Sequence, residues 1–168
     1  SVISFKQTHR PTQGDTHMAD RASTHPFERS HSIVVATTPE AVFDYVSNPK
    51  TWPQWIASSH DLVCEDRPMR FGDTFHEYWS TRSGPVELDW LVIACDAPRL
   101  WNGLTGTQFT GPIVVEYRCE PVAGGTRFTR TLRNPARPKP PTPEMTARID
   151  AEAATALANI KRNLEARG

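Results

Sequence analysis

The chain has 168 residues, and its 19 lysines and arginines are balanced by 19 aspartates and glutamates, so its formal net charge at neutral pH is zero. A balanced charge creates no overall field toward phosphate backbones or anionic membranes, so we expect no nucleic-acid partner. No apolar run reaches membrane-spanning length, and the first residues lack the apolar core of a signal peptide. We therefore expect one globular domain, no stable membrane insertion and a cytoplasmic location.

The three cysteines, Cys64, Cys95 and Cys119, fall inside predicted strands and lack the close Cys/His spacing of a zinc site. An odd number of dispersed cysteines is typical of free thiols in a reducing compartment. Three glycines, Gly103, Gly106 and Gly111, do not have the spacing of a dinucleotide-binding loop. The sequence thus predicts no metal and no cofactor.

Residues 1–30 are polar, lack apolar periodicity and mix charges of both signs. Such a segment cannot bury enough apolar surface to offset the entropy of ordering it. We expect a poorly ordered tail over residues 1–30 and a single domain over residues 31–168.

The predicted domain begins with a short β-branched strand, Ser32–Ala36. Thr38 is a suitable N-cap for the helix that follows, because Pro39 suits its first position and Glu40 lies near its positive end. Asn48-Pro49 should end this helix. A second short helical turn is predicted over Trp52–Ile56.

Six further strands follow, separated by turns rich in glycine and proline. Their predicted ranges are Asp61–Glu65, Asp73–Ser80, Val86–Cys95, Arg99–Thr105, Pro112–Glu120 and Thr126–Arg133. Because most connections are short, consecutive strands should pair antiparallel as a meander.

The last segment, Thr142–Gly168, has the periodicity of one long amphipathic helix. Its apolar face consists of Met145, Ile149, Ala153, Ala156, Leu157, Ile160 and Leu164. A single helix cannot bury this stripe alone, so it should pack on the sheet and can enclose an apolar cavity with it.

The order of these elements resembles the helix-grip fold of the START-like (SRPBCC) superfamily, and in particular its polyketide cyclase/dehydrase and lipid-transport branch. The resemblance rests on Thr38-Pro39-Glu40-Ala41-Val42-Phe43, Trp52-Pro53-Gln54-Trp55, Phe71-Gly72-Asp73-Thr74-Phe75, Asp96-Ala97-Pro98-Arg99-Leu100-Trp101 and Gly124-Gly125-Thr126-Arg127-Phe128. It implies an α+β fold in which a curved antiparallel sheet of about seven strands wraps around a long C-terminal helix, with two short helices after the first strand. It also implies a small hydrophobic partner molecule that is lipid-, aromatic- or polyketide-like.

Alternation along the strands nominates the residues that face the interior. Even positions from Val86 to Ala94 are apolar, as are odd positions from Ile113 to Cys119. The candidate ligand-binding residues are Phe75, Trp79, Trp90, Trp101, Tyr117, Phe128 and, on the last helix, Ile149. For the tryptophans, core packing is the commoner role and the alternative interpretation.

Glu77 and Arg130 are ionisable residues on predicted inner faces that are otherwise apolar. A charge in such a place is costly unless it is paired or hydrogen-bonded. As catalytic candidates, Glu77 would move protons and Arg130 would bind a carboxylate, phenolate or enolate. Alternatively, the two residues form a structural pair, their strand ends are open to water, or a bulge shifts the alternation.

Three functions remain from the sequence. The first is a carrier that binds a small hydrophobic ligand in an internal cavity, as a monomer or homodimer. The second is a polyketide cyclase/dehydratase-like enzyme, for which neither an inward histidine nor a tyrosine–arginine motif can be matched. The third is an interaction module like chaperone-activating members of the superfamily, which would use an exposed apolar surface.

Overall fold

The computed structural model describes residues 23–58, 60–81 and 83–168, without the side chain of His60, so residues 1–22 of the predicted tail lie outside the described residues. In chain order the elements are β1 (Phe27–Val35), α1 (Pro39–Val46), a 3-10 turn (Pro49–Thr51), α2 (Trp52–Trp55), β2 (His60–Val63), β3 (Thr74–Thr81), β4 (Gly84–Asp96), β5 (Leu100–Thr107), β6 (Gly111–Val122), β7 (Gly125–Asn134) and α3 (Pro143–Glu165).

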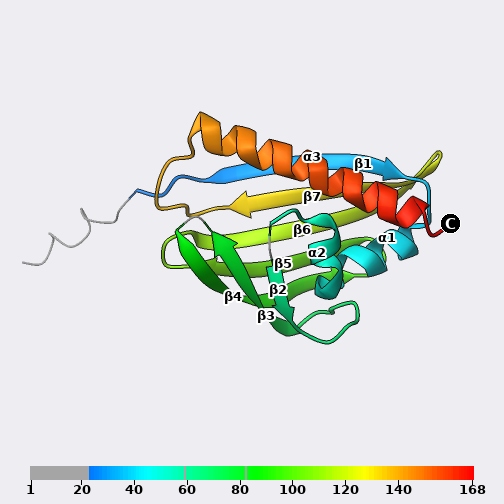
Figure 1. Cartoon of the computed structure of the whole chain (residues 1–168), viewed down its shortest axis with the longest axis horizontal. Helices are drawn as coiled ribbons and strands as arrows, with labels where there is room; N and C mark the ends of the chain where they lie inside the picture. Colours follow the sequence, from blue (N-terminus) through cyan, green and yellow to red (C-terminus); the bar gives the residue numbers. More distant parts are fainter. Residues whose placement is uncertain (1–22, 59, 82) are drawn as a thin grey trace, which may run out of the picture.

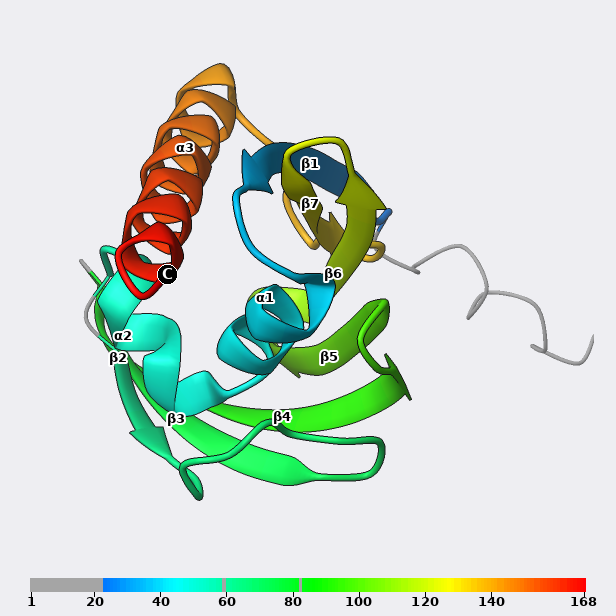
Figure 2. The same ribbon diagram turned by 90° about the vertical axis from the view of Figure 1, so that its right-hand side faces the viewer.

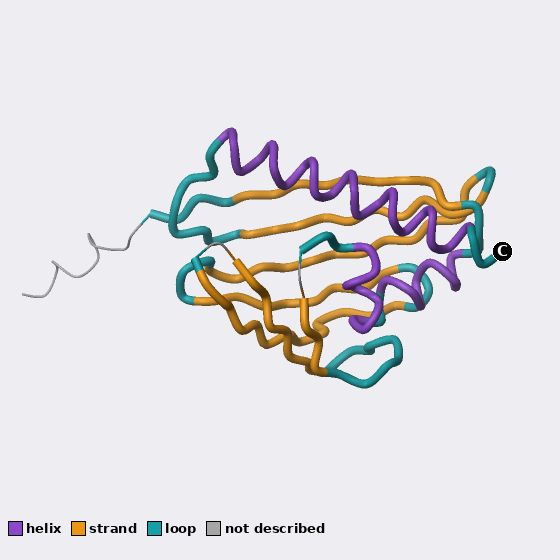
Figure 3. The backbone as a smooth tube through the Cα atoms, in the orientation of Figure 1, coloured by secondary structure: helices purple, strands orange, loops and turns teal. Residues whose placement is uncertain are grey.

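The strands form one antiparallel sheet in the order β1-β7-β6-β5-β4-β3-β2 (Figures 1 and 3). Strands β2 to β7 therefore make the predicted meander, and β1 pairs with β7 at one edge. The curved sheet partly encloses α1 and α2, and α3 runs along the open side next to β1 (Figure 2). The predicted helix-grip fold is confirmed.

The helices begin where the sequence predicted them. The Thr38 hydroxyl accepts a hydrogen bond from the Ala41 amide, and the Thr142 hydroxyl accepts one from the Met145 amide. Each cap satisfies an amide that the first turn of a helix leaves without a partner. Proline follows both caps, at Pro39 and Pro143.

The first strand begins earlier than predicted, at Phe27, which pairs with Asn134 of β7. The proposed tail boundary after Ser30 is therefore wrong. The reason lies in the inward positions at the start of β1, Arg29 and His31, which are polar and hide the apolar alternation of a strand. Both side chains bond to Asp150 of α3 instead of packing in an apolar core.

A second correction concerns β4. The register with β5 shifts between Val92 and Ala94, so that Ala94 pairs with Asn102 and Cys95 pairs with Trp101. This bulge reverses the alternation, because it inserts an extra residue on one strand. Cys95, rather than Ala94, packs against the core.

Candidate functional site

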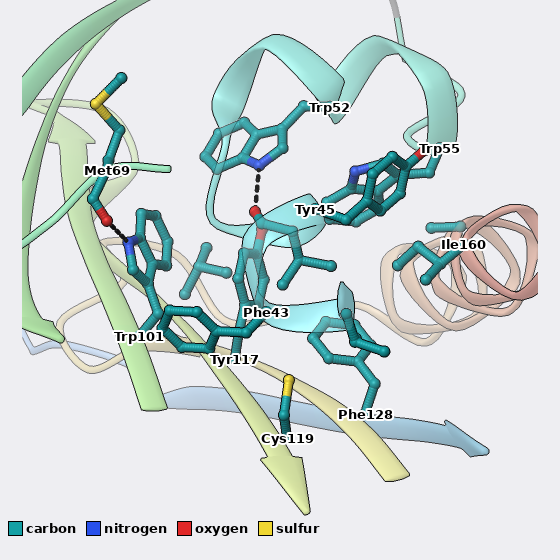
Figure 4. Packing of buried hydrophobic residues seen from close by; sticks show 14 of the residues in the cluster. Phe43, Tyr45, Trp52, Trp55, Met69, Trp101, Tyr117, Cys119, Phe128 and Ile160 are labelled. Carbon is teal, nitrogen blue, oxygen red and sulfur yellow. Dashed lines mark hydrogen bonds between the residues drawn. The ribbon is translucent and has the colours of Figure 1, made fainter. Parts of the chain in front are cut away.

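Most of the aromatic residues predicted to line a cavity pack against one another. Phe75 stacks on Trp90 with ring centroids 5.7 Å apart, and Trp101 stacks on Tyr117 at 5.1 Å. Trp52 of α2 lies edge-on to all four of these rings. Figure 4 shows Trp52, Trp101, Tyr117 and Phe128 in this cluster. Edge-on and offset stacked rings are the favourable geometries for aromatic pairs, so this part of the interior is a close-packed core.

The indole N–H groups of this core all have acceptors. Trp52 Nε1 donates to the Val46 carbonyl and Trp101 Nε1 donates to the Met69 carbonyl, each at 3.0 Å (Figure 4). Trp90 Nε1 donates to Glu77 Oε2 at 2.8 Å. We call the region formed by these aromatic residues the packed end of the inner face. Its members are Trp52, Phe75, Trp90, Trp101, Tyr117 and Phe128.

Glu77 faces inward, as predicted, and only 2% of its surface is exposed. Its carboxyl accepts the Trp90 hydrogen bond and makes a further interaction, so it is held within the packed end. Arg130 lies on β7, with β6, β5 and β4 between it and the strand of Glu77. The two predicted catalytic residues therefore do not lie on neighbouring strands.

The other end of the inner face is only half-buried. Its apolar side chains are Trp79 on β3, Val86 on β4, Ile113 on β6, Leu132 on β7, and Met145 and Ile149 on α3. We call these six residues the open end. They continue the inward rows of the same strands and the same helix face that fill the packed end with buried side chains.

Arg130 stands between the two ends. In the strand register it lies opposite Tyr117 of β6 and opposite His31 of β1. The residue is half-buried, and its Nε is buried with no hydrogen-bond partner among the described residues. In the part of the chain that the structure describes, Arg130 also has no ion pair.

Tyr117 is buried and lies opposite Arg130 in the strand register. Burial raises the pKa of its hydroxyl to about 12, although the nearby charge and hydrogen bond of Arg130 oppose this rise. The phenol therefore stays protonated near neutral pH and can donate a hydrogen bond. Tyr117 and Arg130 thus lie opposite each other on β6 and β7.

A second polar group joins β1 to α3. Asp150 accepts hydrogen bonds from Arg29 at 2.9 and 2.6 Å and lies 2.8 Å from Nε2 of His31. The hydrogen bonds to Arg29 and His31 hold the pKa of the Asp150 carboxyl below its ordinary value. Sequence reasoning missed all three residues, although extending the alternation of β1 back from Ile33 would have placed His31 and Arg29 on the inner face.

Two hollows of the described surface lie away from these residues. One, of about 520 Å³, is on the outer side of β2, β3 and β4, and its lining includes Val63, His76, Asp89 and Leu91 together with Phe75 and Trp90 of the packed end. The other, of about 490 Å³, lies beside α1 and the end of α3. Val63 is 56% exposed, so an interaction module, the third sequence hypothesis, would use the outer hollow.

The described residues contain no cluster of histidine, cysteine and acidic side chains suited to a metal ion. None of the helices in this part of the chain is long and apolar enough to cross a membrane.

Comparison with known proteins identifies relatives of the whole domain. The family model described as polyketide cyclase/dehydrase and lipid transport matches residues 26–165. Protein Rv2574 of Mycobacterium tuberculosis is 29% identical over 123 residues, which cover 68% of this chain and 72% of that protein. Mb2604 of Mycobacterium bovis matches to the same extent.

Solved structures share the fold at lower identity. A Rhodobacter sphaeroides protein superimposes with a TM-score of 0.64 at 19% identity, covering 84% of this chain and 93% of that chain. The di-domain aromatase/cyclase StfQ of the steffimycin biosynthetic pathway gives a TM-score of 0.66 at 14% identity, covering 85% of this chain and 52% of that one.

The family match supports the expected binding of a small hydrophobic ligand. Because the family model covers almost all of the described residues, the chain belongs to the polyketide cyclase/dehydrase and lipid transport family.

Proposed function

We propose that the protein binds a small hydrophobic molecule at the open end of the inner face. The observation that carries this proposal is the contrast in burial along the same strands. Inward side chains at the packed end are almost completely buried, whereas Trp79, Ile113 and Ile149 remain half-buried. Apolar side chains on an inner face that the fold itself leaves partly exposed are typical of a ligand site.

The sequence-nominated residues divide into two roles in this proposal. Trp79 and Ile149 contact the ligand directly, because they belong to the open end. Phe75, Trp90, Trp101, Tyr117 and Phe128 form the closely packed floor below it. The floor gives the site a fixed shape, since stacked rings do not rearrange at low cost.

A neutral fluorescent probe tests the proposal. N-phenyl-1-naphthylamine is titrated into wild-type protein and into Ile149→Glu, which places a charge among the apolar side chains of the open end. The matched control is Thr155→Glu, on the exposed side of α3. We expect binding to wild type and to the control, and at least a tenfold weaker affinity for Ile149→Glu, because a buried charge must lose its hydration.

Equal affinity of all three proteins would place the probe elsewhere and contradict the proposal. So would the absence of probe binding to wild type together with a protein that carries no hydrophobic molecule after purification, as judged by native mass spectrometry and solvent extraction.

A second candidate function is catalysis of polyketide cyclisation, and the Tyr117–Arg130 pair is the observation that favours it. In an intramolecular aldol closure, a proton leaves one carbon of a poly-β-keto chain, the enolate attacks a ketone of the same chain, and water is then lost. Arg130 would stabilise the enolate oxygen and Tyr117 would donate to the oxygen that becomes the alcohol. Glu77 would contribute only if substrate displaced its bond to Trp90.

Turnover separates the two candidates. Arg130→Met should abolish cyclisation of a poly-β-keto thioester while leaving probe binding intact if the protein is an enzyme. If wild type binds such a thioester and returns it unchanged, the carrier function stands alone.

For compartment and assembly we propose a cytoplasmic monomer or homodimer. Three reduced cysteines support this location, with Cys119 buried in the core. Thiol titration of protein taken directly from cells under denaturing conditions should find all three thiols free.

A further inference from the structure

The charged groups near the open end differ in whether they have hydrogen-bond and ion-pair partners. Arg29 and His31 both bond to Asp150, whose two carboxylate oxygens are thereby engaged. Glu77 is held at the packed end by Trp90 and a further interaction. Neither acidic group is within ion-pair distance of Arg130 in the described structure.

Arg130 therefore carries a positive charge that no described carboxylate balances. Its Nε is buried without an acceptor among the described residues, and a guanidinium N–H can only donate a hydrogen bond. Leaving a buried donor unmet costs more than a hydrogen bond contributes when it forms. An acceptor supplied by a ligand would remove this cost, so the site favours anionic ligands over neutral ones.

The Tyr117 hydroxyl extends this arrangement. It lies on the residue opposite Arg130 in the strand register, and burial keeps it protonated, so it can donate a hydrogen bond to a ligand. No acceptor for that proton is found among the described residues. A guanidinium and a phenol side by side offer two donors to the two oxygens of one carboxylate.

We propose that the natural ligand is an amphiphile whose single carboxylate binds Arg130 and Tyr117 while its apolar body lies on Trp79, Ile113 and Ile149. This inference rests on the proposed function and narrows it from any hydrophobic molecule to an organic acid. The half-buried position of the open end allows the apolar body to enter from solvent, with the acid group directed toward the floor.

Matched pairs of ligands test the inference. Dodecanoic acid is compared with 1-dodecanol, and 2-anthracenecarboxylic acid with 2-anthracenemethanol, by displacement of bound N-phenyl-1-naphthylamine at pH 8. In each pair the apolar body is shared and only the head changes. We expect the acid of at least one pair to bind tenfold or more tightly than its alcohol, as charge-assisted hydrogen bonds predict.

Variants of Arg130 and Tyr117 test whether these residues recognise the carboxylate. Arg130→Met should reduce the acid-to-alcohol ratio to about one while leaving alcohol affinity within about twofold, since only the donors are lost. Arg127→Met removes an exposed arginine of the same strand and should leave the ratio unchanged. Arg130→Gln provides the same test should Arg130→Met fail to fold. Tyr117→Phe should lower the acid-to-alcohol ratio less than either substitution of Arg130.

The outcomes separate the two proposals. Equal binding of acid and alcohol in both pairs would overturn the carboxylate inference and leave the hydrophobic site standing. An acid preference that persists in Arg130→Met and Arg130→Gln would also overturn it. If none of the four ligands displaces the bound probe, the carboxylate inference is overturned while the hydrophobic site stands, whereas failure of the probe itself to bind wild type would overturn both.

Discussion

The two ends of the inner face use the same strands in opposite ways. At the packed end, Trp90 and Trp101 are buried and stacked on other rings, Trp52 of α2 lies edge-on to both, and all three indole N–H groups are hydrogen-bonded. At the open end, Trp79 and Ile149 are half-buried, and Arg130 between them and the floor lacks an acidic partner among the described residues. Position along a strand, rather than residue type, therefore separates the core from the proposed site in this domain.

The long helix repeats this division. Its second half buries Ala156, Leu157, Ile160 and Leu164. Its first half leaves Met145 and Ile149 half-buried and is joined to β1 through Asp150. The helix therefore completes the core with one half and borders the proposed ligand site with the other.

The largest expected effect is at the packed end. Trp101→Ala should lower the free energy of unfolding by about 3–5 kcal/mol, because it leaves a large cavity and an unmet Met69 carbonyl. Trp79→Ala, at the open end, should cost about 1 kcal/mol and instead weaken probe binding. Urea denaturation and probe titration measure both variants. Similar losses of stability in Trp101→Ala and Trp79→Ala would contradict the distinction between the packed end and the open end.

Alkaline pH should expose the burial of Tyr117. Because its pKa is raised to about 12 in the folded state, its contribution to stability is complete below the unfolded value near 10 and is lost as pH rises through 12. Once the pH exceeds the folded-state pKa, the free energy of unfolding has fallen by about 3 kcal/mol, because the pKa of Tyr117 is raised by about two units on folding. The difference between denaturation curves of wild type and Tyr117→Phe from pH 8 to 12 isolates this residue, since Cys119 contributes equally to both. A difference that does not change with pH would mean that the hydroxyl reaches solvent.

Arg130 should matter less for stability than its neighbour on the same inward row. Phe128→Ala removes a completely buried ring and should cost about 3–5 kcal/mol. Arg130→Met should change the free energy of unfolding by less than about 1 kcal/mol, or increase it, because a donor without an acceptor is removed. A loss above about 2 kcal/mol in ligand-free protein would show that Arg130 is part of the core and not of the site.

The smallest expected effect is at the link between β1 and α3. Asp150→Asn should destabilise the protein slightly near neutral pH, where the carboxylate is charged and bonded to Arg29 and His31. The folded-state pKa of Asp150 is lowered, so its contribution is present above the unfolded value of about 3.9 and disappears as pH falls through the folded one. Thermal unfolding should therefore show a larger difference from wild type at pH 7 than at pH 3.

Much of this comparison could be predicted from local sequence patterns. Alternation correctly placed Phe75, Glu77, Trp90, Tyr117 and Phe128 inward, because an apolar inner face imposes a period of two on each strand. It placed Ala94 wrongly, because a bulge changes the count without changing the composition of the strand.

The polar part of the candidate site could not be predicted in the same way. Arg29 and Asp150 are 121 residues apart in sequence, and their contact depends on how α3 lies on β1. His31 is polar at an inward position, so the start of β1 resembles a tail until its partner is known. Nor does alternation distinguish the buried Trp101 from the half-buried Trp79, since that difference depends on how far α1 and α2 cover the sheet.

The most direct test of the account is a crystal structure of the protein with N-phenyl-1-naphthylamine bound. The account predicts density for the probe against Trp79, Ile113 and Ile149, above an aromatic floor whose stacked pairs have not moved. Probe density in the outer hollow beside Val63 and Leu91, with the open end unoccupied, would contradict it and favour an interaction surface on the outside of the sheet.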